Sequence, residues 1–188
     1  MTKKLLLVGV ACLLLGLPAW ANILVNPGFE TGALGPWYQD FDAGGPLNWT
    51  VQSAVVHSGG FAAEDNGNKE LRQDFAGILA SNITEISFWA KHPDPNVTDM
   101  AYDFKYSDGT VEHHVFTIGS DWNFFDVTAQ LNTAKTLEGF SIYGNSGGIS
   151  YVDDFTINAG DVPEPGSIVL LGTGLAGLAG VVRRKLRK

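Results

Sequence analysis

The feature that most restricts the fold of this 188-residue sequence is the alternation of apolar and polar residues over many short segments. In the segment 100–106, for example, large apolar side chains alternate with Ala101, Asp103 and Lys105. Adjacent side chains point to opposite faces of a strand, so this pattern predicts half-buried β-strands. We expect strands at 23–26, 50–56, 70–75, 86–91, 100–106, 111–118, 123–127, 140–143 and 151–157.

Turn signals separate these segments. The sequence contains 23 glycines, and Asp108-Gly109 lies between two alternating segments, where it predicts a hairpin turn. Between residues 22 and 160, no segment keeps the 3.6-residue apolar period of a long helix. Eight or nine short strands in one domain therefore predict an all-β fold, an antiparallel β-sandwich.

The first 21 residues have the three parts of a secretory signal peptide. Two lysines precede an apolar run at 5–17, which is followed by the small residues Ala19 and Ala21. We expect export by the general secretion machinery and cleavage by signal peptidase between Ala21 and Asn22. The alternative is a retained membrane anchor, but the apolar run is short beside the roughly 20 residues that span a bilayer.

The C-terminal region has a similar division into parts. A linker at 159–166 leads to an apolar segment at 167–182 and a basic tail at 183–188. As a helix, the apolar segment would extend only about 24 Å, which is marginal for a permanent transmembrane anchor. The positive-inside rule keeps the basic tail cytoplasmic and places the preceding domain outside the membrane.

The linker contains Pro163, Glu164 and Pro165. This motif, the short apolar helix and the basic tail together resemble the PEP-CTERM sorting tail of Gram-negative bacteria. The resemblance implies cleavage at the motif by an exosortase-type membrane protease, after transient anchoring in the inner membrane. It also implies delivery to the cell surface or to an exopolysaccharide matrix. A plain tail anchor is the alternative.

Charge and cysteine content exclude several classes of protein. Residues 22–160 hold five basic and 18 acidic residues, a net charge of −13 with His neutral. A nucleic-acid-binding domain needs a basic surface, so nucleic acid is excluded as a partner. The single cysteine, Cys12, lies in the apolar run of the signal peptide, so the mature domain has neither disulfides nor thiolate ligands.

Two motifs at opposite ends of the domain carry a second resemblance. Asn26-Pro27-Gly28-Phe29-Glu30 lies near its start, and the segment 151–157, which contains Asp153-Asp154, closes it. The order of motifs over 22–158 resembles the galactose-binding-like jelly roll of carbohydrate-binding modules of families 4, 9 and 22. The resemblance implies a jelly-roll sandwich and a polysaccharide partner.

The same motifs suggest a structural calcium ion. Asp153 is in phase with Phe155 and Ile157, so we expect its side chain to point inward, and a buried carboxylate needs a cation or hydrogen bonds. The resemblance favours Glu30 and Asp153 as Ca²⁺ ligands, with Asp154 the less favoured candidate. Calcium prefers such hard oxygen ligands. The alternative is that backbone amides satisfy the carboxylates.

Exposed aromatic rings are the usual platforms for sugars. The candidates are Trp37 and Trp49, which lie in or after glycine-rich loops, and Trp89, which is in the outward phase of its strand. For each of them, ordinary core packing is the alternative. We expect Trp122 to be a core residue.

Nothing in the sequence identifies a reaction. The adjacent residues His113 and His114 point to opposite faces of a strand and cannot easily share a metal, and neither a nucleophile motif nor a phosphate-binding loop is present. We therefore expect a non-catalytic carbohydrate-binding protein of the cell surface or matrix. A structural matrix protein without a specific glycan, or less plausibly a glycan-active hydrolase, is the alternative.

Overall fold

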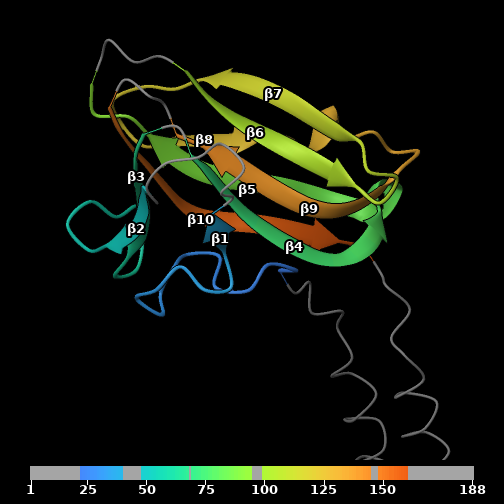
Figure 1. Ribbon diagram of the computed structural model, residues 1–188, viewed down its shortest axis with the longest axis horizontal. Helices are drawn as coiled ribbons and strands as arrows, with labels where there is room; N and C mark the ends of the chain where they lie inside the picture. Colours follow the sequence, from blue (N-terminus) through green and yellow to red (C-terminus); the bar gives the residue numbers. More distant parts are fainter. Residues whose placement is uncertain (1–21, 40–47, 68, 95–98, 145–147, 161–188) are drawn as a thin grey trace, which may run out of the picture.

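The computed structural model describes residues 22–39, 48–67, 69–94, 99–144 and 148–160. In this part, two antiparallel five-stranded sheets pack face to face (Figure 1), which confirms the expected all-β sandwich. Its helices are two short 3₁₀ turns, η1 (Ala80–Asn82) and η2 (Thr128–Gln130), and neither has the length or apolar character of a membrane span. The predicted signal peptide, the motif at 163–165, the apolar helix and the basic tail lie outside the described residues.

The first sheet, here called sheet I, has the strand order β1-β4-β9-β6-β7. In that order its strands are Tyr38–Gln39, Glu70–Leu79, Thr136–Tyr143, Asp99–Tyr106 and Val111–Thr117. The hairpin between β6 and β7 turns at Asp108-Gly109, as predicted. Gly109 has a φ of 82°, and Asp108 accepts a hydrogen bond from the N–H of Thr110, so a glycine is required there.

The second sheet, sheet II, has the order β2-β3-β10-β5-β8. In that order its strands are Trp49–Gln52, Ala62–Asn66, Ile149–Ala159, Ile83–Lys91 and Asn123–Asp126. The last strand of the chain, β10, lies in the middle of the sheet, between β3 and β5. Both of its edges are therefore hydrogen-bonded along much of its length.

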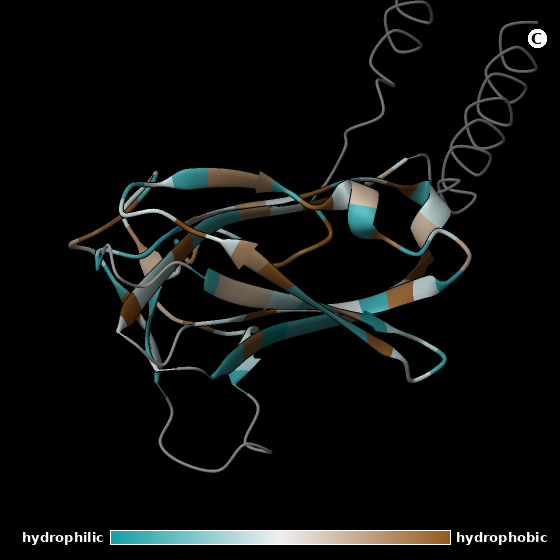
Figure 2. Ribbon diagram, turned by 90° about the horizontal axis from the view of Figure 1, so that it is seen from above, coloured by the Kyte–Doolittle hydropathy of each residue, from teal (hydrophilic) through white to brown (hydrophobic). Residues whose placement is uncertain are grey.

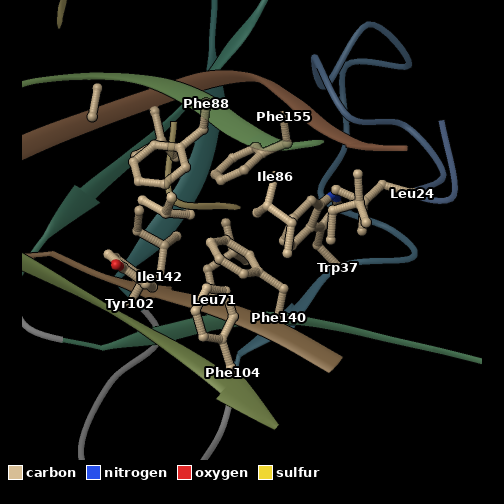
Figure 3. Packing of buried hydrophobic residues seen from close by; sticks show 14 of the residues in the cluster. Leu24, Trp37, Leu71, Ile86, Phe88, Tyr102, Phe104, Phe140, Ile142 and Phe155 are labelled. Carbon is tan, nitrogen blue, oxygen red and sulfur yellow. The ribbon is translucent and has the colours of Figure 1, made fainter. Parts of the chain in front are cut away.

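The hydrophobic core lies between the inner faces of the two sheets (Figure 3). Phe88 of β5 packs against Phe140 of β9 and Phe155 of β10, with ring centroids 5.9 and 5.5 Å apart. Leu24 and Trp37, which come from the N-terminal segment, lie at one side of this cluster. Full burial of each such side chain contributes about 1.5–3 kcal/mol, so the core can hold the domain without disulfides.

Bands of hydrophilic and hydrophobic residues alternate along the strands (Figure 2), as the sequence predicts. The strands differ from expectation at 23–26, at β1, which was not predicted, and at β3. The segment 23–26 forms no strand, because Asn26 has a φ of 54° and Pro27 cannot donate a backbone hydrogen bond. Conversely, β3 was not expected. Its sequence, Ala-Ala-Glu-Asp-Asn, lacks the β-branched and aromatic residues that favour strands.

A β-bulge interrupts β10 between Asp153 and Thr156. Asp154 has a φ of 48°, and one extra residue on β10 changes which positions face the core. Val152 and Phe155 are both core residues, whereas Asp153 is paired with Trp89 on the opposite face of sheet II. The expectation that Asp153 shares the inward phase of Phe155 is therefore wrong, although Asp153 is fully buried.

The N-terminal segment is hydrogen-bonded to the end of β10. The Asn22 side chain accepts hydrogen bonds from the N–H of Ile157 and Leu24, at 3.0 and 3.1 Å, and donates one to the carbonyl of Phe155 at 2.6 Å. The N–H of Ile23 also donates to the carbonyl of Ile157. The residue that follows the predicted cleavage site thus stabilises the fold, while the cleavage itself stays a prediction.

Candidate functional site

The strand register places one row of side chains across all five strands of sheet I. From β1 to β7 the row consists of Tyr38, Arg72, Ser141, Asp103 and His113. The residues that alternate with them in the three central strands are core residues, among them Leu71, Ile142 and Tyr102. The row therefore lies on the outer face of the sandwich.

Two shorter rows flank the first. One consists of Glu70, Tyr143, Ala101 and Val115, and the other of Asp74, Gly139, Lys105 and Val111. Because Gly139 and Ser141 are small, the face is hollowed over β9. The resulting cavity, here called the trough, has a volume of about 270 Å³ and is lined by Glu70, Arg72, Asp103, Lys105, Val111, Phe140, Ser141 and Tyr143.

One side of the trough is fixed by a network around Asp74. Arg72 donates from Nε and Nη2 to the two oxygens of Asp74, at 2.7 and 3.0 Å, and the hydroxyl of Tyr38 donates to Oδ2 at 2.6 Å. Although burial opposes it, these hydrogen bonds hold the pKa of Asp74 below its usual value. Hydrogen bonding to Asp74 in turn raises the pKa of Arg72, so the pair is ionised throughout the physiological range.

The other side is fixed by a network around Asp103. Its Oδ1 lies 2.6 Å from Nδ1 of His113, and its Oδ2 accepts a hydrogen bond from the hydroxyl of Tyr143 at 2.8 Å. Burial and the hydrogen bond to Asp103 raise the pKa of Tyr143, which keeps the phenol neutral. The trough thus presents donors and acceptors at fixed positions, with the fixed charge of Arg72 compensated within the protein.

The predicted metal ligands meet around Gly28. A Cβ at Gly28 would lie 3.2 Å from Oδ1 of Asp154, 3.6 Å from Oδ1 of Asp153 and 3.8 Å from Cγ of Glu30. Residues up to 124 positions apart in the sequence thus lie near one glycine, although the Glu30 carboxylate itself lies at Gly59 and Gly60. The loops at 26–31 and 57–60 bring them together above the outer face of sheet II.

Protein donors already bind these carboxylates. Asp153 accepts hydrogen bonds from the N–H groups of His57, Ser58 and Asp154, at 3.0, 3.3 and 2.8 Å. Burial, reinforced by the charge of Asp154, nevertheless raises the pKa of Asp153 to about 6. Glu30 accepts from the N–H of Gly60 at 3.0 Å.

Among the described residues, no three His, Cys, Asp or Glu side chains converge closely enough to hold a metal ion by themselves. Asp154 is also engaged, by the hydroxyl of Ser58 at 2.9 Å and by Nδ1 of His57 at 2.7 Å. A calcium ion at this place would therefore need backbone carbonyls as additional ligands. Calcium binding stays a prediction.

Two of the predicted sugar-binding tryptophans are core residues, which corrects the sequence-based expectation. Trp37 is 3% exposed and packs against Phe29 and Phe155, while Trp49 is 2% exposed. Each indole N–H donates to a backbone carbonyl, that of Asn26 for Trp37 and that of residue 69 for Trp49. Because these polar groups are satisfied inside the domain, neither ring is free to stack on a ligand.

Trp89 does lie on an outer face, that of sheet II. The ring of His57 stacks on it at 3.8 Å with an interplanar angle of 16°, so one face of the indole is covered. Phe124 lies beside it and is 52% exposed. Trp122, expected in the core, is instead half-buried next to His57, with the Lys91 ammonium 6.0 Å from its ring centroid.

Sequence reasoning missed the trough. Its polar residues occupy outward positions in strands, where a charged residue usually means only exposure to solvent. The spacing of Arg72 and Asp74, two residues apart on one strand face, was a usable signal for an ion pair. Their cross-strand neighbours, however, depend on a register that no local pattern specifies.

Comparison with known proteins identifies the C-terminal region. Residues 161–185 match the PEP-CTERM protein-sorting motif. The sorting motif contains the predicted Pro163-Glu164-Pro165 and lies outside the described residues. Among curated proteins, none matches this sequence.

Several solved carbohydrate-binding modules have a fold similar to the described domain. TmCBM61, solved in complex with beta-1,4-galactotriose, has a TM-score of 0.56 and 21% identity, covering 74% of this chain and 99% of that one. A family 16 carbohydrate-binding module has a TM-score of 0.51 and 16% identity, over 72% and 99% of the two chains. The CBM22-1 xylan-binding domain of Paenibacillus barcinonensis Xyn10C has a TM-score of 0.52 and 12% identity, over 78% and 100%. These similarities establish the shared β-sandwich fold.

Proposed function

We propose that this chain is an exported, non-catalytic protein that binds a neutral polysaccharide in the trough of sheet I. The observation that carries the proposal is the pair of fixed networks facing each other across Ser141. Arg72 and Asp74 form one network, and Asp103 and Tyr143 belong to the other. Sugar hydroxyls are both donors and acceptors, so they match a site that offers both kinds of group.

The charge balance of the trough favours a neutral ligand. Arg72 is neutralised by Asp74 at 2.7 Å, and Lys105 shares the cavity with Glu70 and Asp103. Neither sign of charge is left in clear excess, and the domain as a whole is strongly acidic. A cavity of about 270 Å³ is large enough for about one sugar ring with its hydroxyls.

The similar folds support the same proposal. TmCBM61 was solved with a galactose oligosaccharide, and the other two neighbours are described as carbohydrate-binding or xylan-binding domains. Such modules bind sugars without transforming them, and the trough offers hydrogen bonds without an activated nucleophile. A structural matrix protein without a specific glycan remains the alternative, and it predicts no binding at the trough.

A glycan array, followed by calorimetry on the glycans that bind, tests the site. Arg72→Gln and Asp103→Asn should each weaken binding by about tenfold or more, because each removes a hydrogen-bonding group that the networks hold at a fixed position in the trough. Trp89→Ala, on the opposite sheet, is the matched control and should bind as the unmodified protein does. Weaker binding by Trp89→Ala, with unchanged binding by the two trough variants, would instead place the site on the outer face of sheet II. Binding to no glycan on the array would support the structural alternative.

For localisation, we propose removal of the signal peptide at Ala21–Asn22 and exosortase cleavage at the sorting motif. The support is the match at 161–185 for the sorting step and the three-part pattern of residues 1–21 for removal of the signal peptide. We further propose transient anchoring in the inner membrane of a Gram-negative cell. The product would then reach the cell surface or an exopolysaccharide matrix. Mass spectrometry of the exported protein should find Asn22 at its N-terminus and no basic tail.

A variant of the motif tests the sorting step directly. Glu164→Ala should leave the chain in the membrane fraction with its basic tail attached, while Glu138→Ala, an acidic residue of β9, should be exported normally. Export of the Glu164 variant in cleaved form would contradict the proposal.

We also propose a structural calcium ion near Gly28, held by Glu30, Asp153 and, in a minor role, Asp154. The support is that the carboxylates of Asp153 and Asp154 and the Cγ of Glu30 lie near Gly28, and that burial raises the pKa of Asp153, a cost that a divalent cation would offset. Ca²⁺ should raise the melting temperature, and Asp153→Asn should abolish this response. Asp65→Asn, which changes a buried acid elsewhere, should retain it. An unchanged melting temperature after EGTA treatment would contradict calcium binding.

A further inference from the structure

The free edge of sheet I is the outer side of β7. This strand pairs only with β6 among the described residues. The N–H of Tyr106 donates to the carbonyl of Thr110 at 3.0 Å, which sets the phase of the hairpin. In an antiparallel pair, hydrogen-bonded and non-hydrogen-bonded positions alternate. Glu112, His114 and Phe116 therefore bond to β6, while the residues between them direct their N–H and C=O groups outward.

Four residues present these outward backbone groups, namely Val111, His113, Val115 and Thr117. In the described part of the chain, none of their backbone groups takes part in a hydrogen bond outside the pairing with β6. Their side chains are on the outer face of sheet I, where Val115 is 64% exposed and Val111 is 54% exposed. The edge thus combines free backbone groups with exposed β-branched side chains.

Natural proteins usually protect such an edge with lysine, proline, a bulge or a very short strand. The seven residues of β7 contain no lysine and no proline, and the pairing with β6 has no bulge. None of its four outward positions carries an acidic residue, although residues 22–160 hold 18 acidic residues. An edge that lacks these devices and has no acidic residue at its outward positions is a surface suited to strand pairing.

We propose that β7 pairs with β7 of a second copy of this chain, antiparallel and about a twofold axis at His114. In this register Val111 lies opposite Thr117 and His113 lies opposite Val115, so all four outward residues enter hydrogen-bonded positions. No acidic side chain faces another at these positions, and the β-branched pairs favour the contact.

The composition of the edge favours a second copy over an unrelated segment. When two β7 strands run antiparallel, each outward side chain of one lies opposite a compatible side chain of the other, as an isologous twofold interface requires. Pairing would join two copies of sheet I into one continuous ten-stranded sheet. The two troughs would then lie side by side on the same face, because His113 ends the row that begins at Tyr38.

The proposal has an electrostatic signature. Each copy carries a net charge of −13 over residues 22–160, so long-range repulsion opposes association at low ionic strength. Salt screens this repulsion, whereas the strength of the backbone hydrogen bonds and apolar contacts at the edge depends little on salt concentration. The dimer should therefore be tighter at high salt than at low salt.

Sedimentation equilibrium of the purified full chain, at low and high salt, tests the proposal. We expect a monomer–dimer equilibrium that tightens with salt and that Val115→Lys weakens by about tenfold or more. Val25→Lys is the matched control, because Val25 is 61% exposed and lies outside both sheets, so this variant should associate like the unmodified chain. Monomers at every concentration and salt, or equal weakening by both variants, would overturn the proposal.

Hydrogen exchange provides a readout that needs no variant. The outward amides of Val111, His113, Val115 and Thr117 should exchange more slowly as the protein concentration rises about a hundredfold, while the amides of the other edge strands should not change. Amides of β7 whose exchange is independent of concentration would overturn the proposal even if the chain associates, because association would then use another surface.

Discussion

Asp65 of β3 is a fully buried acid, and among the residues that the structure describes neither of its carboxylate oxygens has a hydrogen-bond partner. Burial raises its pKa to about 7, against the opposing effect of nearby amides in the turn that follows and of the Lys69 charge. A side chain on Gly144 would clash with this carboxylate, so the strand end beside it must be glycine. At the scale of the residue, Asp65 is therefore a position where the stability of the fold depends on pH.

The sign of this sensitivity follows from the direction of the shift. Between the pKa of about 4 in the unfolded chain and about 7 in the folded chain, only the folded state binds the proton, so stability falls as pH rises. Asp65→Asn should make the melting temperature less dependent on pH between 5 and 7. The pKa of Asp153 is raised in the same way, so the Asp65→Asn variant should keep some pH dependence of its melting temperature at lower pH.

Thermal unfolding of both proteins across this range provides the measurement. The unmodified protein should lose roughly 1 kcal/mol of stability per pH unit through Asp65 alone. Equal slopes for the variant and the unmodified protein would mean that Asp65 is not protonated in the fold.

Single residues were also where sequence reasoning was least complete. The proximity of Asp153 to Glu30 was predicted, because motifs at both chain ends indicated it, whereas the burial of Asp153 was predicted from a strand phase that the bulge in β10 changes. Trp37 and Trp49 were assigned to a surface that they do not reach. Their glycine-rich surroundings indicate a loop, but whether a loop side chain turns inward depends on cavities that other segments create.

At the scale of the element, a glycine turn holds the Glu30 carboxylate in place. Gly59 has a φ of 62°, and the N–H of the next residue, Gly60, donates a hydrogen bond to Glu30. A Cβ at Gly59 would clash with the Glu30 carboxylate, whereas a Cβ at Gly109 would meet no atom within 4 Å. A side chain at Gly109 would therefore cost only the strain of a left-handed backbone conformation, whereas a side chain at Gly59 would add a steric clash to that strain.

Alanine substitutions at these glycines should differ accordingly. Gly109→Ala should lower the free energy of unfolding by about 1–2 kcal/mol, the usual cost of a left-handed conformation. Gly59→Ala should cost clearly more, because it also displaces Glu30. Urea denaturation of the two variants compares them, and equal losses would show that the Glu30 carboxylate yields freely.

Most elements followed from local sequence, because alternation and turn residues act over a few positions. The bulge in β10 could not be predicted in this way, since neither Asp153 nor Asp154 is a glycine. Asp154 nevertheless has a φ of 48°. The same limit applies to the trough, whose row from Tyr38 to His113 joins five strands through their register. Register depends on long-range pairing, which one sequence does not specify.

At the scale of the whole molecule, the negative charge separates the two proposed interactions. Binding of a neutral glycan in the trough should change less than about twofold between low and high salt, because the ligand has no charge to be repelled. Association through β7 should strengthen over the same range. Calorimetry with the glycan and sedimentation of the protein, in matched buffers, measure both. A strong salt dependence of glycan affinity would indicate a charged sugar instead.

The broad organisation of the molecule was the most predictable part. The β-sandwich followed from alternation and turns, and the sorting motif at 161–185 followed from three segments in a fixed order. Both depend on patterns that many residues share, so that no single residue decides them. The trough depends on a few side chains brought together only by the fold.

The position of β10 has a mechanical consequence. Any tension that enters the domain through the chain beyond Ala159 reaches a strand of eleven residues held by β3 on one edge and by β5 on the other. A pull along that strand loads many hydrogen bonds in parallel, as shear, whereas a strand at a sheet border can be peeled away bond by bond. A force applied to the chain beyond Ala159 would therefore load the domain through a strand that is paired on both of its edges.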